Sequence, residues 1–299
     1  MSFSTLSKIC LTFSGILVAA SIVLLIWPGP LLSMEFTGGT LMNITIPQEK
    51  TKEDVRAAID AFRTVDGKTL GMVALSTTKE GNVLIRMRDI GNDDHIALLE
   101  TFNAKVGDVT EKQFTSIGPT VGATLKRRSV EALIIASIGI VLYIAIAFRK
   151  VPRKLSPWRF GVFAVAAMIH DLLVTAGIFV IISHLTNFEF DTLFITALLT
   201  ILGYSVNDTI IIFDRIRENV AFADKHEDFA QVAERSLWET FIRTINTSIT
   251  TLIMLFCLFF LGSESIRWFI LALIIGISFG NYSSYFVATP LLIFLRKKE

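Results

Sequence analysis

Long apolar runs dominate this sequence and restrict the folds that it can adopt. A segment of about 20 predominantly apolar residues is long enough to cross a bilayer as a helix. Charged residues make up only 18% of the chain and the mean hydropathy is +0.60, whereas about 25% is usual for soluble domains. We therefore expect a polytopic α-helical membrane protein with six transmembrane helices. The expected spans are residues 9–28, 129–148, 160–184, 191–213, 243–261 and 267–295.

Basic residues predict the orientation of these spans. The loop between the second and third spans is basic and holds no acidic residue, so the positive-inside rule places it in the cytoplasm. The C-terminal basic cluster agrees, so we expect both termini inside and residues 30–128 outside. Lys126, Arg127 and Arg128 oppose this orientation, but the rule is weak after a domain of about 90 residues. The basic residues of the loop and the C-terminus are Arg149, Lys150, Arg153, Lys154, Arg159, Arg296, Lys297 and Lys298.

Several other classes of protein are disfavoured. A net charge of +1 gives no strong field for nucleic acid. The two cysteines, Cys10 and Cys257, both fall in apolar runs and suggest no disulfide framework. The first apolar run has no A-x-A cleavage site after it, and we interpret it as an uncleaved anchor. We expect no cofactor and no metal.

The outer region between the first two spans has the pattern of a small α+β domain. Met42, Ile44 and Ile46 alternate with other residues, as in a half-buried strand. The order of expected elements is βαββαβ, that of a ferredoxin-like module, a fold that hosts many functions. The remaining elements are a helix over 55–62 after a capping box of Thr51 and Asp54, strands over 72–77 and 83–88 across a turn at 80–82, a helix over 99–106 and a strand over 109–116.

Two charged residues stand inside or at the edge of apolar runs. Asp208 lies within the fourth run, where a carboxylate costs about 3 kcal/mol or more to insert, and its default interpretation is a site for ions, protons or substrate. Arg243 opens the fifth run, and the two residues can lie at similar depth. The structural alternative is a neutral Asp208 bonded to a neighbouring threonine, with Arg243 extending to the interface.

Polar residues also recur at helical spacing in these runs. Arg243, Asn246, Thr247 and Thr250 share one face of the fifth span, and Tyr204 lies one turn from Asp208 in the fourth. If these two faces turn toward each other, they form a hydrated seam inside the bundle.

The third and sixth spans carry further patterns of this kind. His170-Asp171 lies midway through the third span and predicts either a proton relay or a buried pair that fixes helix packing. Gly276, Gly280 and Ser284 follow four-residue spacing in the last span, which permits close helix approach.

Six short motifs are distributed over nearly the whole chain. Any one of them alone is a weak signal, but their number and order make the set highly specific. They are Met34–Thr40, which contains Phe36, Gly38 and Gly39; Gly118–Gly122, which contains Pro119; His170-Asp171; Gly203–Asp208; Phe213–Asn219; and Arg243–Ser248.

Together these motifs resemble those of the SecF family of protein-export membrane proteins. Glu35 stands where an aspartate is frequent in that family, and it keeps the charge. The resemblance implies a six-helix bundle like a half-unit of the RND superfamily, paired with SecD and associated with SecYEG, YajC and the translocating preprotein. It implies that the proton motive force drives late steps of translocation, with Asp208 and Arg243 as the transmembrane acid and arginine of the family. It also implies a bacterial plasma (inner) membrane location and no enzymatic activity.

The expected domain boundaries follow from these patterns. Residues 1–30 form the first transmembrane helix, 31–125 the periplasmic ferredoxin-like domain and 126–299 the other five helices. Phe36, Gly38, Gly39, Gly118 and Pro119 are candidate hinge residues where the domain joins the bundle. Alternative functions are a subunit of an RND-type small-molecule exporter and a non-titrating scaffold for SecD. An intramembrane enzyme is disfavoured because the sequence has no GxGD around Asp208 and no HExxH.

Overall fold

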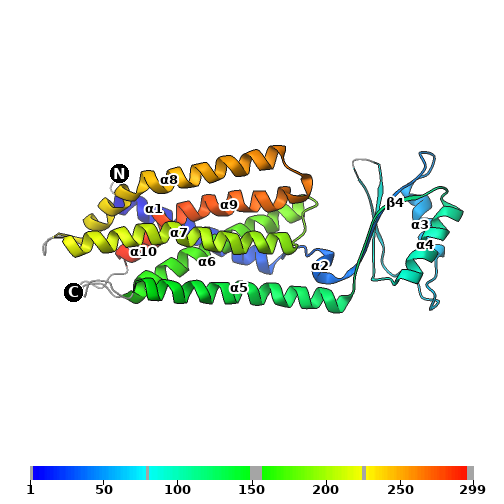
Figure 1. Cartoon of the computed structure of the whole chain (residues 1–299), viewed down its shortest axis with the longest axis horizontal. Helices are drawn as coiled ribbons and strands as arrows, with labels where there is room; N and C mark the ends of the chain where they lie inside the picture. The colour runs from blue at the N-terminus through cyan, green and yellow to red at the C-terminus, as the bar shows by residue number, and fades with distance from the viewer. Residues whose placement is uncertain (1–2, 79–80, 149–156, 224–226, 295–299) are drawn as a thin grey trace. The chain divides into compact units, whose positions relative to one another are not determined.

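The fold is that of a computed structural model, which describes residues 3–78, 81–148, 157–223 and 227–294 (Figure 1). Within these residues the chain divides into two compact units, one of residues 1–31 and 130–299 and one of residues 32–129. We call them the membrane unit and the sheet unit and describe each by itself. The loop residues 149–154 and the C-terminal basic cluster, which gave the predicted orientation, lie outside the described residues.

The membrane unit is built from long apolar helices. Among the described residues six helical segments are long and apolar enough to cross a membrane, which confirms the six predicted spans. The last of them is not one regular helix, since it contains a short 3-10 turn, a π-helical turn and a final α-helical piece. The segments are α1 (Phe3–Ile26), α5 (Pro119–Ala147), α6 (Pro157–Leu185), α7 (Thr192–Phe222), α8 (Phe229–Leu261), and η1 (Glu264–Ile266) with α9 (Arg267–Ser283), η2 (Ser284–Ala288) and α10 (Thr289–Phe294).

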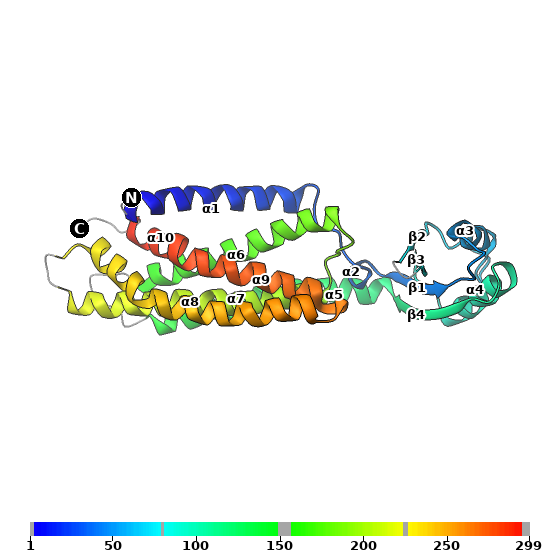
Figure 2. The same cartoon turned by 90° about the horizontal axis from the view of Figure 1, so that it is seen from above.

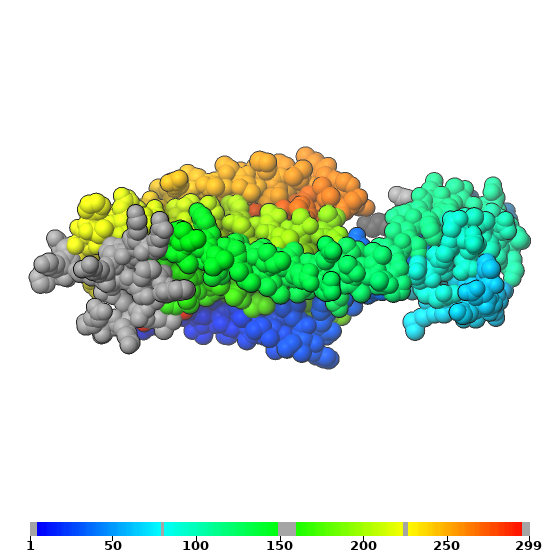
Figure 3. All heavy atoms as spheres, turned by 60° about the horizontal axis from the view of Figure 1, so that its bottom comes forward, coloured from blue at the N-terminus to red at the C-terminus, as the bar shows by residue number. Residues whose placement is uncertain are grey.

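Helix α9 lies at the centre of the unit. It packs against α6, α7 and α8, while α1 packs against α6 and against the η2 and α10 segments that continue α9. Figure 2 shows α1 on one side of α9 and α10, and α8 on the other. Helix α5 lies on the surface of the unit, and its side chains Ile135 and Leu142 are 68% and 58% exposed (Figure 3). These side chains suit contact with lipid, because apolar groups there lose nothing by exposure.

Two helices extend well beyond the predicted spans. Helix α7 continues to Phe222 and α8 begins at Phe229, whereas the apolar runs end at 213 and begin at 243. Polar side chains of the two extensions pair with each other: Arg215 Nε lies 2.6 Å from Glu239 Oε2, and Asn219 donates to the same oxygen at 2.8 Å. The added turns are thus held by cross-helix polar contacts, which hydropathy does not detect.

The sheet unit has the element order expected from the sequence. Its four strands, counted over the described residues, form one antiparallel sheet in the order β2-β3-β1-β4. The strand over 72–77 is shorter than predicted, because Met72 is 95% exposed and pairing begins at Ala74. The elements are α2 (Met34–Thr37), β1 (Gly39–Thr45), α3 (Lys52–Ala61), β2 (Ala74–Thr77), β3 (Val83–Met87), α4 (Asn92–Lys105) and β4 (Thr110–Ile117).

The core of the sheet unit lies between the sheet and its two helices. Met42 and Ile44 of β1 are fully buried, as their alternation predicted, and so is Phe102 of α4. The predicted capping box at the start of α3 is also present, with the backbone N–H of Thr51 donating to Asp54 Oδ2 at 2.8 Å. This bond lowers the pKa of the Asp54 carboxyl, because it stabilises the ionised form.

Candidate functional site

The carboxyl group of Asp208 is fully buried in the membrane unit. One oxygen, Oδ2, accepts a hydrogen bond from Ser248 Oγ on α8 at 3.4 Å, a long and therefore weak contact. The other oxygen, Oδ1, has no hydrogen-bond partner among the described residues. A buried carboxylate with half of its acceptors unused is costly, so this position is suited to change its protonation state or its partner.

A short chain of hydroxyl groups joins α7 to α8 at this acid. Tyr204, one turn before Asp208, donates to Ser248 Oγ at 3.2 Å, and Ser248 in turn donates to Asp208. The predicted shared face of Tyr204 and Asp208 is thereby confirmed, since both reach the same serine. Thr244, one turn before Ser248, is buried too, and its hydroxyl also lacks a partner within the described chain.

The predicted seam between Asp208 and the Arg243 face is wrong within this chain. Arg243, Asn246, Thr247 and Thr250 are exposed on α8, and no ion pair joins Arg243 to Asp208 among the described residues. The α8 side chain that contacts Asp208 is the smaller Ser248, and Thr244, one turn before it, is buried on the same side of the helix. The physical reason is desolvation, because a guanidinium packed between helices of one chain needs more partners than α7 provides.

His170 and Asp171 form a second buried polar cluster, at the contact of three helices. His170 Nδ1 lies 2.9 Å from Asp171 Oδ1 within α6. Ser205 of α7 and Ser283 of α9 both donate to Asp171 Oδ2, at 2.5 and 2.8 Å. Asp171 therefore uses both oxygens and ties α6, α7 and α9 together. Across the described residues only the His170 Nε2 atom of this cluster has no partner.

Helix α9 packs closely against α7 next to this cluster. A Cβ atom on Gly276 would overlap the Ile201 side chain, and one on Gly280 would lie 3.3 Å from Ser205 Cα. The stripe of small residues in the last span is thus a packing surface, as its spacing predicted, and it brings Ser283 to Asp171.

Comparisons with known proteins agree with this architecture. Residues 98–298 match the family described as "Protein export membrane protein SecD/SecF, C-terminal". The chain is 40% identical over 290 residues to the protein translocase subunit SecF of Thermobaculum terrenum, covering 95% of this chain and 90% of that one. It is 36% identical over 271 residues to the subunit of the same name from Synechocystis, covering 88% and 82%.

The chain belongs to the SecD/SecF family. A solved structure, that of SecDF, a translocon-associated membrane protein from Thermus thermophilus, superposes with a TM-score of 0.80 at 29% identity. The match covers 100% of this chain and 39% of the SecDF chain, so the chain spans well under half of that protein. A second SecDF structure, in a "Super-membrane-facing form", gives a TM-score of 0.68 over 98% of this chain. The chain is accordingly a multi-pass membrane protein of the SecD/SecF family.

The SecD/SecF motifs at the two ends of the sheet unit meet in space. Gly38 and Gly39 have φ values of +75° and +130°, which favour glycine. A Cβ on Gly38 would lie 2.9 Å from Pro119 Cα, and one on Gly122 would lie 2.9 Å from the Gly38 nitrogen. Phe36 is buried beside them, and Gly118 lies next to Asp89. The residues before β1 thus pack backbone to backbone on the first turn of α5, which no single motif predicts.

Three serines of the site were not singled out by sequence reasoning. Ser205 and Ser248 lie inside quoted family motifs. Helical spacing places Ser205 on the face of Asp208, three residues away, whereas Ser248 lies off the predicted Arg243 face and only the packing of α8 against α7 reveals it. Ser283 lies outside every quoted motif, and only the packing of α9 against α6 and α7 reveals it. Among the described residues no group of three or more His, Cys, Asp or Glu side chains is arranged to hold a metal ion.

Proposed function

We propose that this chain is the SecF subunit of the Sec translocon accessory complex and that, with SecD, it uses the proton motive force to assist late steps of protein translocation. Membership of the SecD/SecF family, the relatives named protein translocase subunit SecF and the SecDF superposition support this role. SecYEG, YajC and the translocating preprotein are the further partners that we propose. We assign the chain no enzymatic reaction and place it in the bacterial inner membrane.

The buried, half-satisfied carboxyl of Asp208 is the observation that carries the proposal. One elementary charge moved through the membrane potential is worth about 2.3 kcal/mol per 100 mV. A carboxyl that takes up a proton from one side and releases it to the other transfers this energy to the helix arrangement around it. The weak bond from Ser248 gives α8 little preference for one protonation state, so that a small rearrangement of α8 suffices to change the partner of Asp208.

The proposed role of Arg243 differs from the sequence-based expectation that its face turns toward Asp208 within this chain. Its exposed face, shared with Asn246, points away from the packed interior of the membrane unit. In a lipid environment an exposed guanidinium is costly, and we propose that SecD covers it. The charge that responds to Asp208 then lies at a subunit boundary, where relative motion of SecF and SecD can change their separation.

The sheet unit is, in this proposal, a ferredoxin-like domain on the extracytoplasmic side, with both chain termini in the cytoplasm. Its strand order β2-β3-β1-β4 and its βαββαβ element order support the first part. Backbone contacts of Gly38 with Pro119 and of Gly122 with Gly38 hold the entry and exit of the domain together. We propose that these residues transmit motion between helix and domain as one joint.

The topology is tested with a cysteine at Thr77, on β2, in a background that lacks Cys10 and Cys257. A membrane-impermeant maleimide added to intact spheroplasts is expected to label Thr77→Cys from the outside. Labelling only after the membrane is opened would show that the sheet unit faces the cytoplasm, and the proposed orientation would fail.

Proton coupling is tested with Asp208→Asn, which keeps the size and removes the titration. Vesicles that contain this variant with SecD are expected to keep the complex but to lose the stimulation of preprotein export by an imposed proton gradient. Asp214→Asn is the matched control, because Asp214 lies on the same helix, has a side chain that is 55% exposed and forms an ion pair with Arg217 three residues on. If Asp208→Asn vesicles respond normally to the gradient, Asp208 does not couple proton flow to export, and the role of the chain as a scaffold for SecD remains.

A further inference from the structure

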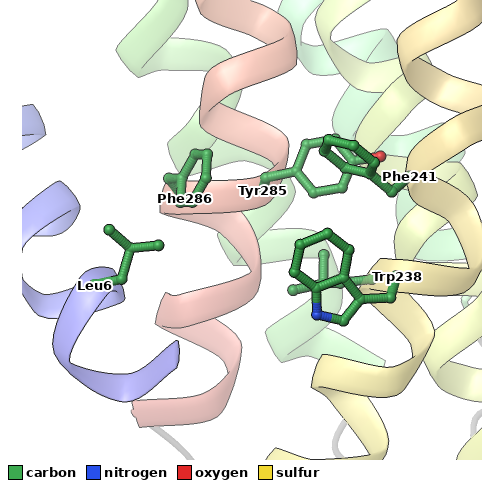
Figure 4. A pocket seen from close by; sticks show the side chains of 6 residues that line it. Leu6, Trp238, Phe241, Tyr285 and Phe286 are labelled. Carbon is green, nitrogen blue, oxygen red and sulfur yellow. The ribbon is translucent and has the colours of Figure 1, made fainter. Parts of the chain in front are cut away.

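An apolar recess opens on the membrane unit between α1 and α8, and one of its lining residues, Tyr285, also lies near Asp208. It has a volume of about 70 Å³ and is lined by Leu6, Leu237, Trp238, Phe241, Tyr285 and Phe286. In Figure 4 the aromatic rings of η2 form its floor, with Leu6 on one side and the α8 rings on the other. The lining surface is almost wholly apolar, so a ligand with a hydrocarbon chain fits it and a polar ligand does not.

Contacts among the aromatic side chains hold the walls of the recess in place. The ring of Phe241 lies 5.4 Å from that of Trp238 and 5.5 Å from that of Tyr285, so the three aromatic side chains support one another. The floor is the π-helical turn η2, where Thr289 Oγ1 bonds the Ser284 carbonyl oxygen at 3.0 Å, five residues back. Such turns inside α-helices occur frequently at functional sites. Inside a bilayer hydrophobicity alone gives an acyl chain no preference for the protein over bulk lipid. A rigid concave surface can still bind an acyl chain, because its shape allows more dispersion contacts with the chain.

The recess opens to the surroundings of the helices. Trp238 is 63% exposed and Leu6 38%, whereas Leu237 and Tyr285 beneath them are buried. Trp238 lies in the part of α8 that still carries charged residues, before the uninterrupted apolar run, which is where tryptophan favours the membrane interface. An acyl chain can therefore enter from the side while its headgroup stays at the level of the polar residues.

A cation lies on α1, the helix that contributes Leu6 to the recess. The Nζ atom of Lys8, two residues beyond Leu6 on α1, lies 6.0 Å from the ring centroid of Phe294 on α10, which continues η2. Lys8 is exposed and its long stem lets the ammonium group reach toward the interface. Its charge complements a lipid phosphate.

The polar face of α8 points in another direction. With 3.6 residues per turn, Trp238 and Phe241 are centred about half a turn from Arg243 and Asn246. A partner subunit that covers the polar face thus leaves the recess open to lipid. We propose that this recess binds a segment of one acyl chain of a bilayer phospholipid, with the lipid phosphate near Lys8.

Brominated phospholipids quench tryptophan at short range and test this in nanodiscs with the full chain. The reporter keeps Trp238 and carries Trp27→Phe, Trp158→Phe and Trp268→Phe. The comparison reporter also carries Trp238→Phe and has Phe260→Trp, at a position 72% exposed on the same helix and outside the recess. At a low mole fraction of brominated phosphatidylcholine we expect about twofold greater quenching of Trp238, as a modest binding preference gives.

Two changes of the recess sharpen the test. Leu6→Phe fills the space and is expected to reduce the quenching of Trp238 to that of the comparison reporter, whereas Ile16→Phe on the exposed surface of α1 is expected to leave it unchanged. Phe286→Leu widens the floor of the recess and is expected to increase the quenching of Trp238. This variant keeps the test valid if Leu6→Phe fails to fold. Quenching of Trp238 that rises in simple proportion to the mole fraction of brominated lipid, and that none of these substitutions changes, would show ordinary contact with the bilayer. No quenching at all would show that a protein segment covers the recess. Either result overturns the proposal.

Discussion

The two buried acids of the membrane unit differ in how fully their hydrogen bonds are satisfied. Asp171 accepts bonds at both oxygens from His170, Ser205 and Ser283, which belong to three helices. Asp208, also fully buried, accepts one long bond from Ser248 at Oδ2, and its Oδ1 has no partner in the part of the chain that the structure describes. Both aspartates are buried in the helix bundle, and they differ in the number of hydrogen bonds that their carboxyl groups accept.

This difference separates a structural role from a functional one. A fully bonded carboxylate resists change, because any movement breaks several charge-assisted bonds at once. A carboxylate with a free acceptor loses little when its neighbours move. We accordingly propose that Asp171 fixes the packing of α6, α7 and α9, and that Asp208 is the group that changes state. Within the Asp171 cluster, His170 Nε2 is the one side-chain atom that has no partner among the described residues.

The largest expected effect is on the stability of the Asp171 cluster. Asp171→Ala leaves His170 Nδ1 and Ser205 Oγ without an acceptor and Ser283 with only its bond to the Gly280 carbonyl oxygen, and it is expected to destabilise the protein by about 3–5 kcal/mol. Asp208→Ala removes one weak bond and is expected to cost about 1 kcal/mol or less. Thermal unfolding of the detergent-solubilised variants measures both, and equal losses at the two positions would remove the distinction between the acids.

A smaller effect is expected at the helix contact that brings Ser283 to Asp171. In Gly276→Ala the new Cβ overlaps the Ile201 side chain, and overpacking of this kind costs about 1–3 kcal/mol. Gly203→Ala is the matched control on α7, since a Cβ there meets nothing within 4 Å. The unfolding midpoint is expected to fall only in Gly276→Ala. Alanine favours the helix over glycine, so a fall of similar size in both variants could not come from helix propensity and would show that the α7–α9 contact at Gly276 is not its cause.

The smallest effect is expected at Asp54, an exposed acid outside the membrane unit. Its folded-state pKa is lowered by the bond from the Thr51 N–H, so its contribution to stability is present above its ordinary pKa of 3.8 and is lost as the pH falls through the lower folded value. Asp54→Asn is expected to speed amide exchange in the first turn of α3 at neutral pH, and the difference should shrink below pH about 4. A difference that persists unchanged into acid would show that the charge of Asp54 does not matter.

The predictable parts of the site are those that depend on one helix at a time. The position of Asp208 in an apolar run, its shared face with Tyr204 and the small-residue stripe of α9 all follow from helical spacing, and the structure contains them. The direction of the Arg243 face was not predictable in this way. Spacing shows that Arg243 and Asn246 share a face, but rotation of α8 about its axis is set by its neighbours.

The sequence by itself determined that this chain has six segments long and apolar enough to cross a membrane, with a small α+β unit between the first two, because run length and residue alternation follow from bilayer thickness and strand geometry. Only the tertiary structure decided which acid is satisfied, because Ser205, Ser248 and Ser283 reach their carboxylates from other helices. It also decided how far α7 and α8 extend, since their polar turns depend on contacts such as that of Arg215 with Glu239. Such contacts join residues distant in the sequence, and their geometry is fixed only when the helices pack.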